Sequence, residues 1–206
     1  MHIPQSPTTD LDIVTFNAAL SAMQTAALPY DHEKWLYIPH TYGEYRYILG
    51  TKGKRPLICI GVNPSTAAPD ALDNTLKSVQ RIAHANGYDS FIMFNVYAQR
   101  ATSPDDMERT LNGALHRENL RALEWVLQQA GDSPAIWAAW GAVIEKRAYL
   151  TACVQDMMAL GKRYGAVWYT AGARSKQKGH PHHPLYLKKD TPLDIFDDIE
   201  TYLQTI

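Results

Sequence analysis

The sequence has only two cysteines, no long apolar run and no excess of charge of either sign. Cys59 and Cys153 lie within apolar segments, which indicates buried thiols in a reducing compartment and not a disulfide framework. No apolar run approaches the roughly 18 residues that a membrane-spanning helix needs. The first ten residues also lack the basic and apolar regions of a secretory signal. We therefore expect a soluble, cytoplasmic protein with no membrane partner.

The balance of charge excludes a protein that is basic over its whole surface. Twenty Lys and Arg against 21 Asp and Glu give a formal net charge of -1, which still permits a local basic groove. With 206 residues and 46% hydrophobic side chains, the chain is long and apolar enough for one domain with a sizeable core.

Several common active-site motifs are also missing. The chain has no GxGxxG and no GxxxxGK[ST] segment, so the physical basis of a dinucleotide or P-loop site is absent. Ser65 lacks the flanking residues of a nucleophile elbow, and neither cysteine lies in a setting that would activate it. His180, His182 and His183 are close in sequence, but their spacing is not that of a known zinc site. We expect no metal and no cofactor.

Short apolar segments alternate with longer segments of helical periodicity. The predicted strands cover residues 44–49, 56–61, 90–96, 134–140 and 166–170, and the first is followed by a turn at 50–53. The predicted helices cover residues 11–27, 72–83, 120–130, 149–160 and 195–206. This alternation predicts an α/β fold, a three-layer α/β/α domain with a central, mainly parallel sheet. We place the domain at residues 44–206 and expect an N-terminal tail and helical extension over residues 1–43.

Polar residues follow the predicted strands at their carboxyl ends, where open α/β sheets bind ligands. Because the carboxyl ends of parallel strands meet at one edge, we expect these residues to form a single site. The candidate binding residues at the first two of these ends are Gly61, Pro64, Ser65, Thr66, Asn95, Tyr97 and Arg100. Trp140-Gly141 ends the next strand and is most simply structural, and a long loop at 172–187 follows the last.

The segments GVNPSTA, FNVYAQRAT, AWG and HPHHPLYL resemble an uncharacterised bacterial and phage family with an NPSTA motif, over roughly residues 44–187. The same arrangement is similar, less specifically, to the uracil-DNA glycosylase superfamily. That resemblance implies the superfamily's fold, with Asn63 positioning the attacking water and Asn95 recognising the base. His183, or alternatively His180, falls at the superfamily's last motif. The chain departs from it at Ser65, where the mismatch-specific branch tends to have Gly, and lacks the activating Asp of the uracil branch.

These residue types suit cleavage of an N-glycosidic bond, which passes through an oxocarbenium-like sugar. The Asn63 carbonyl can orient a water molecule, although it cannot remove a proton from it. A histidine facing the departing base can stabilise the charge that develops there. In a duplex substrate the base would have to be flipped out, and Leu185 or Tyr186 could then act as the wedge.

The segment 171–189 contains five Lys and Arg residues and no acid. It is either a solvated loop or a phosphate-binding one, with Arg174, Lys176 and Lys178 as the candidate ligands of a nucleic acid or nucleotide. Arg46 is either an edge charge that opposes aggregation or a ligand contact. The sequence thus predicts a nucleobase-recognising enzyme that hydrolyses an N-glycosidic bond in DNA or a nucleotide. The alternative is a non-catalytic nucleic-acid or modified-base binding module on the same fold.

Overall fold

The computed structural model describes all 206 residues and contains one mixed sheet of seven strands. The strands are β1 (Trp35–Ile38), β2 (Ile48–Thr51), β3 (Pro56–Gly61), β4 (Ser90–Asn95), β5 (Ala135–Ala138), β6 (Val167–Ala171) and β7 (Leu193–Ile195). Their order is β1-β2-β4-β3-β5-β6-β7. The four central strands run parallel, whereas β1, β2 and β7 pair antiparallel. The α/β class predicted from the sequence is confirmed, but the sheet is parallel only at its centre.

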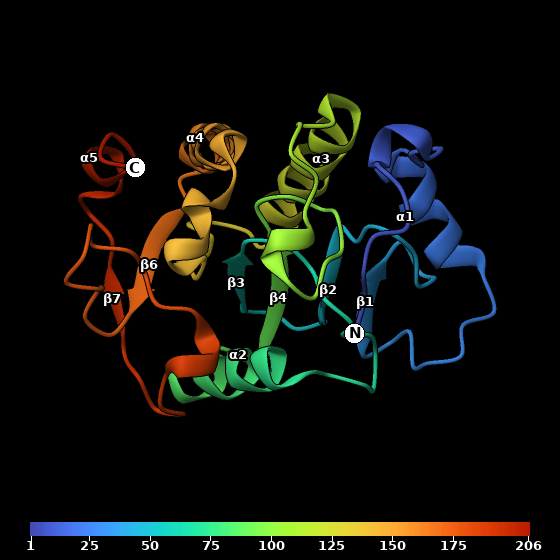
Figure 1. Cartoon of the computed structure of the whole chain (residues 1–206). Coiled ribbons are helices and arrows are strands. Elements are labelled where there is room, and N and C mark those ends of the chain that lie inside the picture. The colour runs from blue at the N-terminus through green and yellow to red at the C-terminus, as the bar shows by residue number, and fades with distance from the viewer.

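Helices cover both faces of this sheet (Figure 1). The α-helices are α1 (Phe16–Thr25), α2 (Asn74–Ala85), α3 (Gly113–Gln129), α4 (Ala148–Arg163) and α5 (Ile199–Leu203). Short 3₁₀ helices are η1 (Thr8–Asp10), η2 (Pro104–Asp106), η3 (Gly141–Lys146) and η4 (Pro184–Tyr186). Helices α1, α3, α4 and α5 lie on one face, and α2 lies with η4 on the other.

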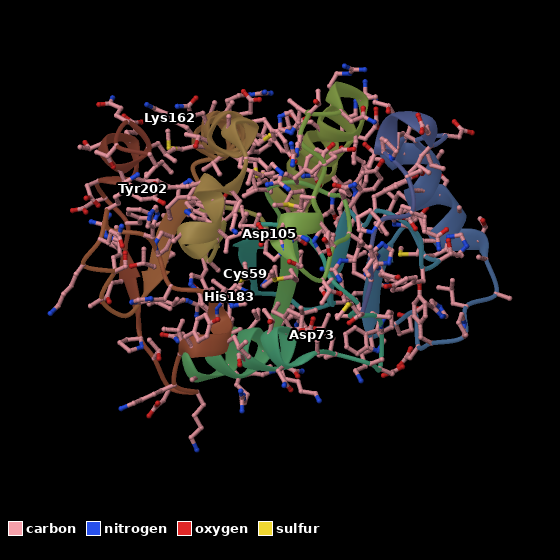
Figure 2. All side chains as sticks on the ribbon, viewed as in Figure 1. Cys59, Asp73, Asp105, Lys162, His183 and Tyr202 are labelled. Atoms are coloured by element: carbon pink, nitrogen blue, oxygen red, sulfur yellow. The ribbon has the colours of Figure 1, made fainter.

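The central strands are buried on both faces because side chains alternate between two cores. Ile58 and Ile60 of β3 pack with the larger helical layer, whereas Leu57 and Cys59 pack against α2. Figure 2 shows Cys59 in the middle of the molecule, surrounded by packed side chains. Both cysteines are free and buried, as the sequence predicts. Burial raises the pKa of the Cys153 thiol to about 12 and that of Cys59 well above its usual value, so neither is an activated nucleophile.

The N-terminal 43 residues contribute more than a tail and a helix, because they also supply the edge strand β1, paired with β2. Thr8 donates from Oγ1 to Glu108 at 2.7 Å and accepts from Asn112 Nδ2 at 3.0 Å. The Phe16 amide, at the start of α1, donates to Glu118 of α3 at 2.8 Å. These bonds join the first 16 residues to a segment about 100 positions later in the chain.

Two sequence predictions of local structure are wrong, for different physical reasons. The first predicted strand starts only at Ile48, and Gly50 lies within it and not in a turn. Glycine is required there because a Cβ would overlap the Phe91 carbonyl oxygen of β4. The closing helix does not start at Ile195, because Ile195 pairs with Tyr169 of β6 as the last residue of β7. Helix α5 is limited to Ile199–Leu203. None of the helices has the length and apolarity that crossing a bilayer requires.

Candidate functional site

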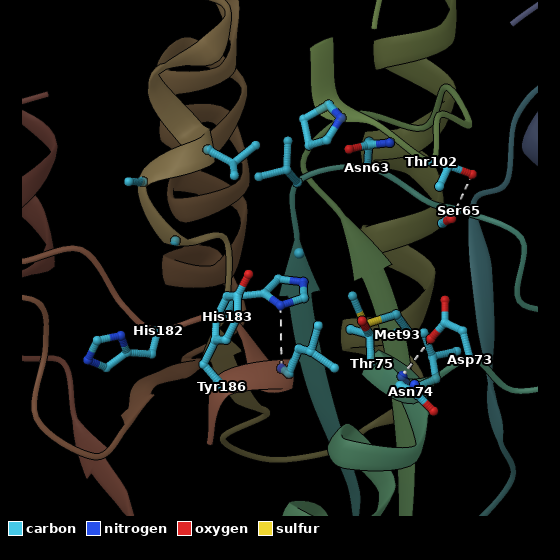
Figure 3. Close-up of a pocket in the computed structure, with 18 of the residues that line it drawn as sticks. Asn63, Ser65, Asp73, Asn74, Thr75, Met93, Thr102, His182, His183 and Tyr186 are labelled. Atoms are coloured by element: carbon cyan, nitrogen blue, oxygen red, sulfur yellow. Dashed lines mark hydrogen bonds between the residues drawn. The ribbon is translucent and has the colours of Figure 1, made fainter. Parts of the chain in front are cut away.

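A cavity of about 750 Å³ opens at the carboxyl ends of β3 and β4 (Figure 3). Its walls come from the loop after β3, the start of α2, the turn of η3 and the loop between β6 and β7. The sequence-predicted residues that line it are Gly61, Asn63, Ser65, Thr66, His180, His183, Leu185 and Tyr186. Those that do not are Pro64, Asn95, Tyr97, Arg100, Arg174, Lys176 and Lys178.

Asn63 is half-buried on the loop that follows β3. Its Nδ2 donates to the Ala101 carbonyl oxygen at 2.7 Å and to that of Pro64 at 3.1 Å. These two bonds fix the amide, and Oδ1 has no partner within the protein. Asn63 therefore stabilises the loop through its nitrogen and leaves a carbonyl oxygen free to accept a hydrogen bond from a ligand or water.

His183 lies on the wall of the cavity opposite Asp73 (Figure 3). Its Nδ1 accepts from the Leu185 amide at 3.4 Å, so the ring proton is on Nε2 and is available as a donor. Burial lowers the pKa of His183, and the charge of Asp73 acts in the opposite direction. The imidazole is therefore neutral near pH 7, with Nε2–H as its donor.

His180, the alternative to His183, is held by other side chains. Its Nδ1 accepts from the Tyr202 hydroxyl at 2.9 Å, and that hydroxyl oxygen accepts from Trp140 Nε1 at 3.0 Å. Its Nε2 lies 3.6 Å from a carboxylate oxygen of Glu145. The hydrogen bond to Tyr202 and the nearby Glu145 hold His180 in the wall of the cavity, so of these two histidines His183 is the one more open to a ligand.

Asp73 is the one acidic residue that lines the cavity, and the sequence analysis did not select it. It caps α2, since Oδ1 accepts from the Leu76 amide at 2.9 Å, while Oδ2 has no hydrogen-bond partner within the protein. A carboxylate can accept the proton of a water molecule, which the amide of Asn63 cannot do. The only signal in the sequence is an ordinary N-cap pattern, Asp73 before a helical stripe, which by itself indicates structure.

Asn95 lies behind the cavity and not in its lining. Its Oδ1 accepts from Arg46 Nη2 at 3.3 Å, and its buried Nδ2 has no partner. Gly61 and Met93 line the cavity, and both lie close to the Asn95 side chain or to each other. A Cβ built on Gly61 would lie 2.6 Å from Met93 Cε and 3.2 Å from Asn95 Nδ2. The expected contact between Asn95 and a base is therefore not open in this structure.

Two buried arginines donate hydrogen bonds to backbone carbonyl oxygens of the loop after β3. Arg46 donates to the Ala67 carbonyl oxygen at 3.2 Å, and Arg100 donates to that of Ser65 and, at 2.8 Å, to the Tyr37 hydroxyl. Burial lowers the pKa of Arg46 to about 9, with the charge of Arg100 as the next cause. Arg46 is thus not an edge charge, and Arg100 supports the site without lining it.

Tyr97 and the basic loop also have structural partners. The buried Tyr97 hydroxyl donates to Glu108 and accepts from the Asn112 amide. Arg174 pairs with Asp198 and Lys178 with Glu145, each at 2.6 Å. Lys176 is exposed and has no carboxylate partner. Distant acids therefore neutralise two of the five positive charges of this loop, because sequence neighbours alone do not set the local charge.

An α/β domain with a cavity at the carboxyl ends of its parallel strands belongs to the large class of ligand-binding α/β folds. Within it, the chain belongs to the family described as Protein of unknown function (DUF1643), whose model matches residues 46–185. That range covers the loop after β3, the start of α2 and the histidine loop. Neither the comparison with curated proteins nor the comparison with solved structures gave a match.

Proposed function

We propose that this protein recognises a nucleobase and hydrolyses its N-glycosidic bond, on a three-layer fold similar to that of the uracil-DNA glycosylase superfamily. The observation that supports it is the presence in one cavity of a free amide oxygen on Asn63, a carboxylate on Asp73 and a neutral imidazole on His183. The three groups supply what the reaction needs: an acceptor that aims water, a base for its proton and a donor for the departing base.

The proposed reaction breaks the bond between the sugar carbon and the base nitrogen, and the electron pair leaves with the base. The Nε2–H of His183 donates a hydrogen bond to the base as negative charge develops on it. Asn63 Oδ1 orients a water molecule, whose oxygen bonds to the sugar carbon of the oxocarbenium-like species. Asp73 takes one proton of that water and then releases it to solvent, and the departing base anion takes one proton from solvent, so the products are the free base and the sugar hydroxyl.

Base release tests this proposal directly. The substrates are nucleosides and single- and double-stranded oligonucleotides with uracil, mismatched thymine and damaged or hypermodified bases, and free base is detected by mass spectrometry. Asn63→Ala and His183→Ala should each reduce release by about 10²–10⁴-fold, the usual contribution of a positioned catalytic group. The matched controls Asn17→Ala and His32→Ala change exposed residues outside the cavity and should keep wild-type rates.

Release that is unchanged in both cavity variants would show that the mechanism is wrong. Retention of a substrate with no release from it would contradict hydrolysis and favour the non-catalytic binding module.

A further inference from the structure

We infer that the cavity takes an uncharged nucleoside, base and sugar together, and not a nucleotide phosphate or a base displaced from a polynucleotide. This inference rests on the proposed function, since it names the substrate class of the same site. The charges in the cavity, the charges around its mouth and its size are three observations that support it.

The cavity contains no positive side chain that could bind a phosphate. Its 23 lining residues include no Lys and no Arg, and its one carboxylate belongs to Asp73. A phosphate inside it would lose much of its hydration and face a negative charge with no cation to offset either cost. A neutral ligand avoids both costs, because its hydroxyl and ring N–H groups can donate to the same carboxylate.

Two of the lysines near the mouth, Lys178 and Lys146, are paired with carboxylates, and Lys176 is exposed without such a partner. Next to the lining residues Val143 and Ser175, Lys178 binds Glu145 at 2.6 Å, and Lys146 binds Asp105 at 2.6 Å. Binding to a polynucleotide depends on several Lys and Arg that neutralise phosphates and release their counterions. Two nearby ion pairs and a net charge of -1 do not provide such a track.

The size and lining of the cavity suit a whole small molecule. About 750 Å³ falls within the range of roughly 300–1,000 Å³ typical of pockets that enclose such ligands. At the start of α2, Asn74 and Thr75 offer polar side chains to sugar hydroxyls. Leu185 and Tyr186, which are 46% and 80% exposed, offer apolar area against which a base can stack.

Calorimetric binding distinguishes the three classes of ligand. The probes are a panel of purine and pyrimidine ribo- and deoxyribonucleosides, their 5′-monophosphates and single-stranded oligonucleotides of the same bases, each at about 50 and 200 mM salt. We expect at least one nucleoside to bind with a Kd that salt does not change. Its monophosphate should bind at least about tenfold more weakly, the effect of roughly 1.4 kcal/mol.

Two variants test the physical cause of this selectivity. Asp73→Asn removes the charge but keeps a residue that caps helices equally well, so it should fold normally and bind the monophosphate nearly as well as the nucleoside. Lys176→Ala removes an exposed cation of the loop that has no carboxylate partner and should leave the nucleoside Kd unchanged.

Each outcome separates this inference from the function on which it rests. Tighter binding of oligonucleotide with a steep salt dependence, or a preference for the monophosphate, would overturn the inference, while base release from that ligand would leave the proposed function standing. A nucleoside that binds without losing its base would support the inference and contradict the function. No binding of any probe would contradict both.

Discussion

Arg46 and Arg100 are the most unusual residues of the structure, because both are almost fully buried and neither has a carboxylate partner. Burying a charge without an opposite charge is costly, so each guanidinium must be satisfied by hydrogen bonds. The acceptors are carbonyl oxygens of the loop after β3, the Asn95 amide and the Tyr37 hydroxyl, and they bind the terminal nitrogens, while the buried Nε of each arginine has no partner. The two arginines therefore set the shape of the loop that presents Asn63.

The two positions should differ in their effect on stability. Arg100→Met leaves two buried groups, Ser65 O and the Tyr37 hydroxyl, without a partner. Arg46→Met leaves one, Asn95 Oδ1, because Ala67 O keeps a contact to Arg100 at 3.4 Å, and it relieves the repulsion between the two charges. We expect Arg100→Met to lower the free energy of unfolding by about 1–3 kcal/mol for each buried group left unpaired, and Arg46→Met by less. Urea unfolding measures both, and the reverse order would contradict this account.

Which residues line the cavity was only partly predictable from the sequence. Asn63 and His183 were expected there because they follow the ends of predicted strands, and both line it, while their roles stay predictions. Asp73 was missed because its pattern is that of a helix cap, and whether a cap faces solvent or a cavity depends on what packs opposite it. The place of Arg46 stayed undecided because an alternating sequence indicates two faces of a strand, but not which face a distant loop covers.

At the scale of elements, α5 matters more than its five residues suggest, because its Tyr202 fixes the histidine loop. The hydroxyl connects Trp140 to His180 across two hydrogen bonds. Tyr202→Phe should cost about 1–3 kcal/mol of stability, since both partners stay buried and lose a bond. Hydrogen exchange should quicken at the Ser175 and His180 amides but not in α2.

Tyr164→Phe is the matched control. The partly buried Tyr164 hydroxyl binds Glu124 and Gln128 near the surface, so its loss should cost less stability. An unchanged exchange rate in Tyr202→Phe would show that α5 does not hold the loop.

The central strands of the sheet, whose residues are mostly buried on both faces, were predictable from the sequence, whereas the edge strands were not. β3, β4, β5 and β6 were identified from short apolar runs bounded by turns, as expected for strands covered on both faces. β1 and β7 were missed, and both are edge strands that pair with a neighbour on one side only. Their positions are set by pairing with β2 and β6 and not by local preference.

For the whole molecule, the two buried histidines make stability depend on pH. Burial lowers the pKa of His180 and His183 below 6.5, so the unfolded chain binds protons more readily than the folded one. The contribution of these histidines to the free energy of unfolding is fully present above about pH 6.5. It is lost as pH falls through the pKa values that the two histidines have in the folded protein, by at most about 1.4 kcal/mol per pH unit for each. Urea unfolding at pH 7.5, 6.5 and 5.5 checks this. His183→Gln should flatten the decline, and the exposed His32→Gln should not.

The hydrogen bonds between the N-terminal segment and the start of α3 also constrain how the chain acquires its structure during synthesis. Thr8 and Phe16 have their partners about 100 residues downstream, at Glu108 and Glu118. At about 5–20 residues per second, a ribosome needs roughly 5–20 s to make that stretch. Through this interval the apolar face of α1, with Phe16, Ala19 and Met23, has no α3 to pack against. The first α-helix to be made therefore waits for the third before its apolar face can be covered.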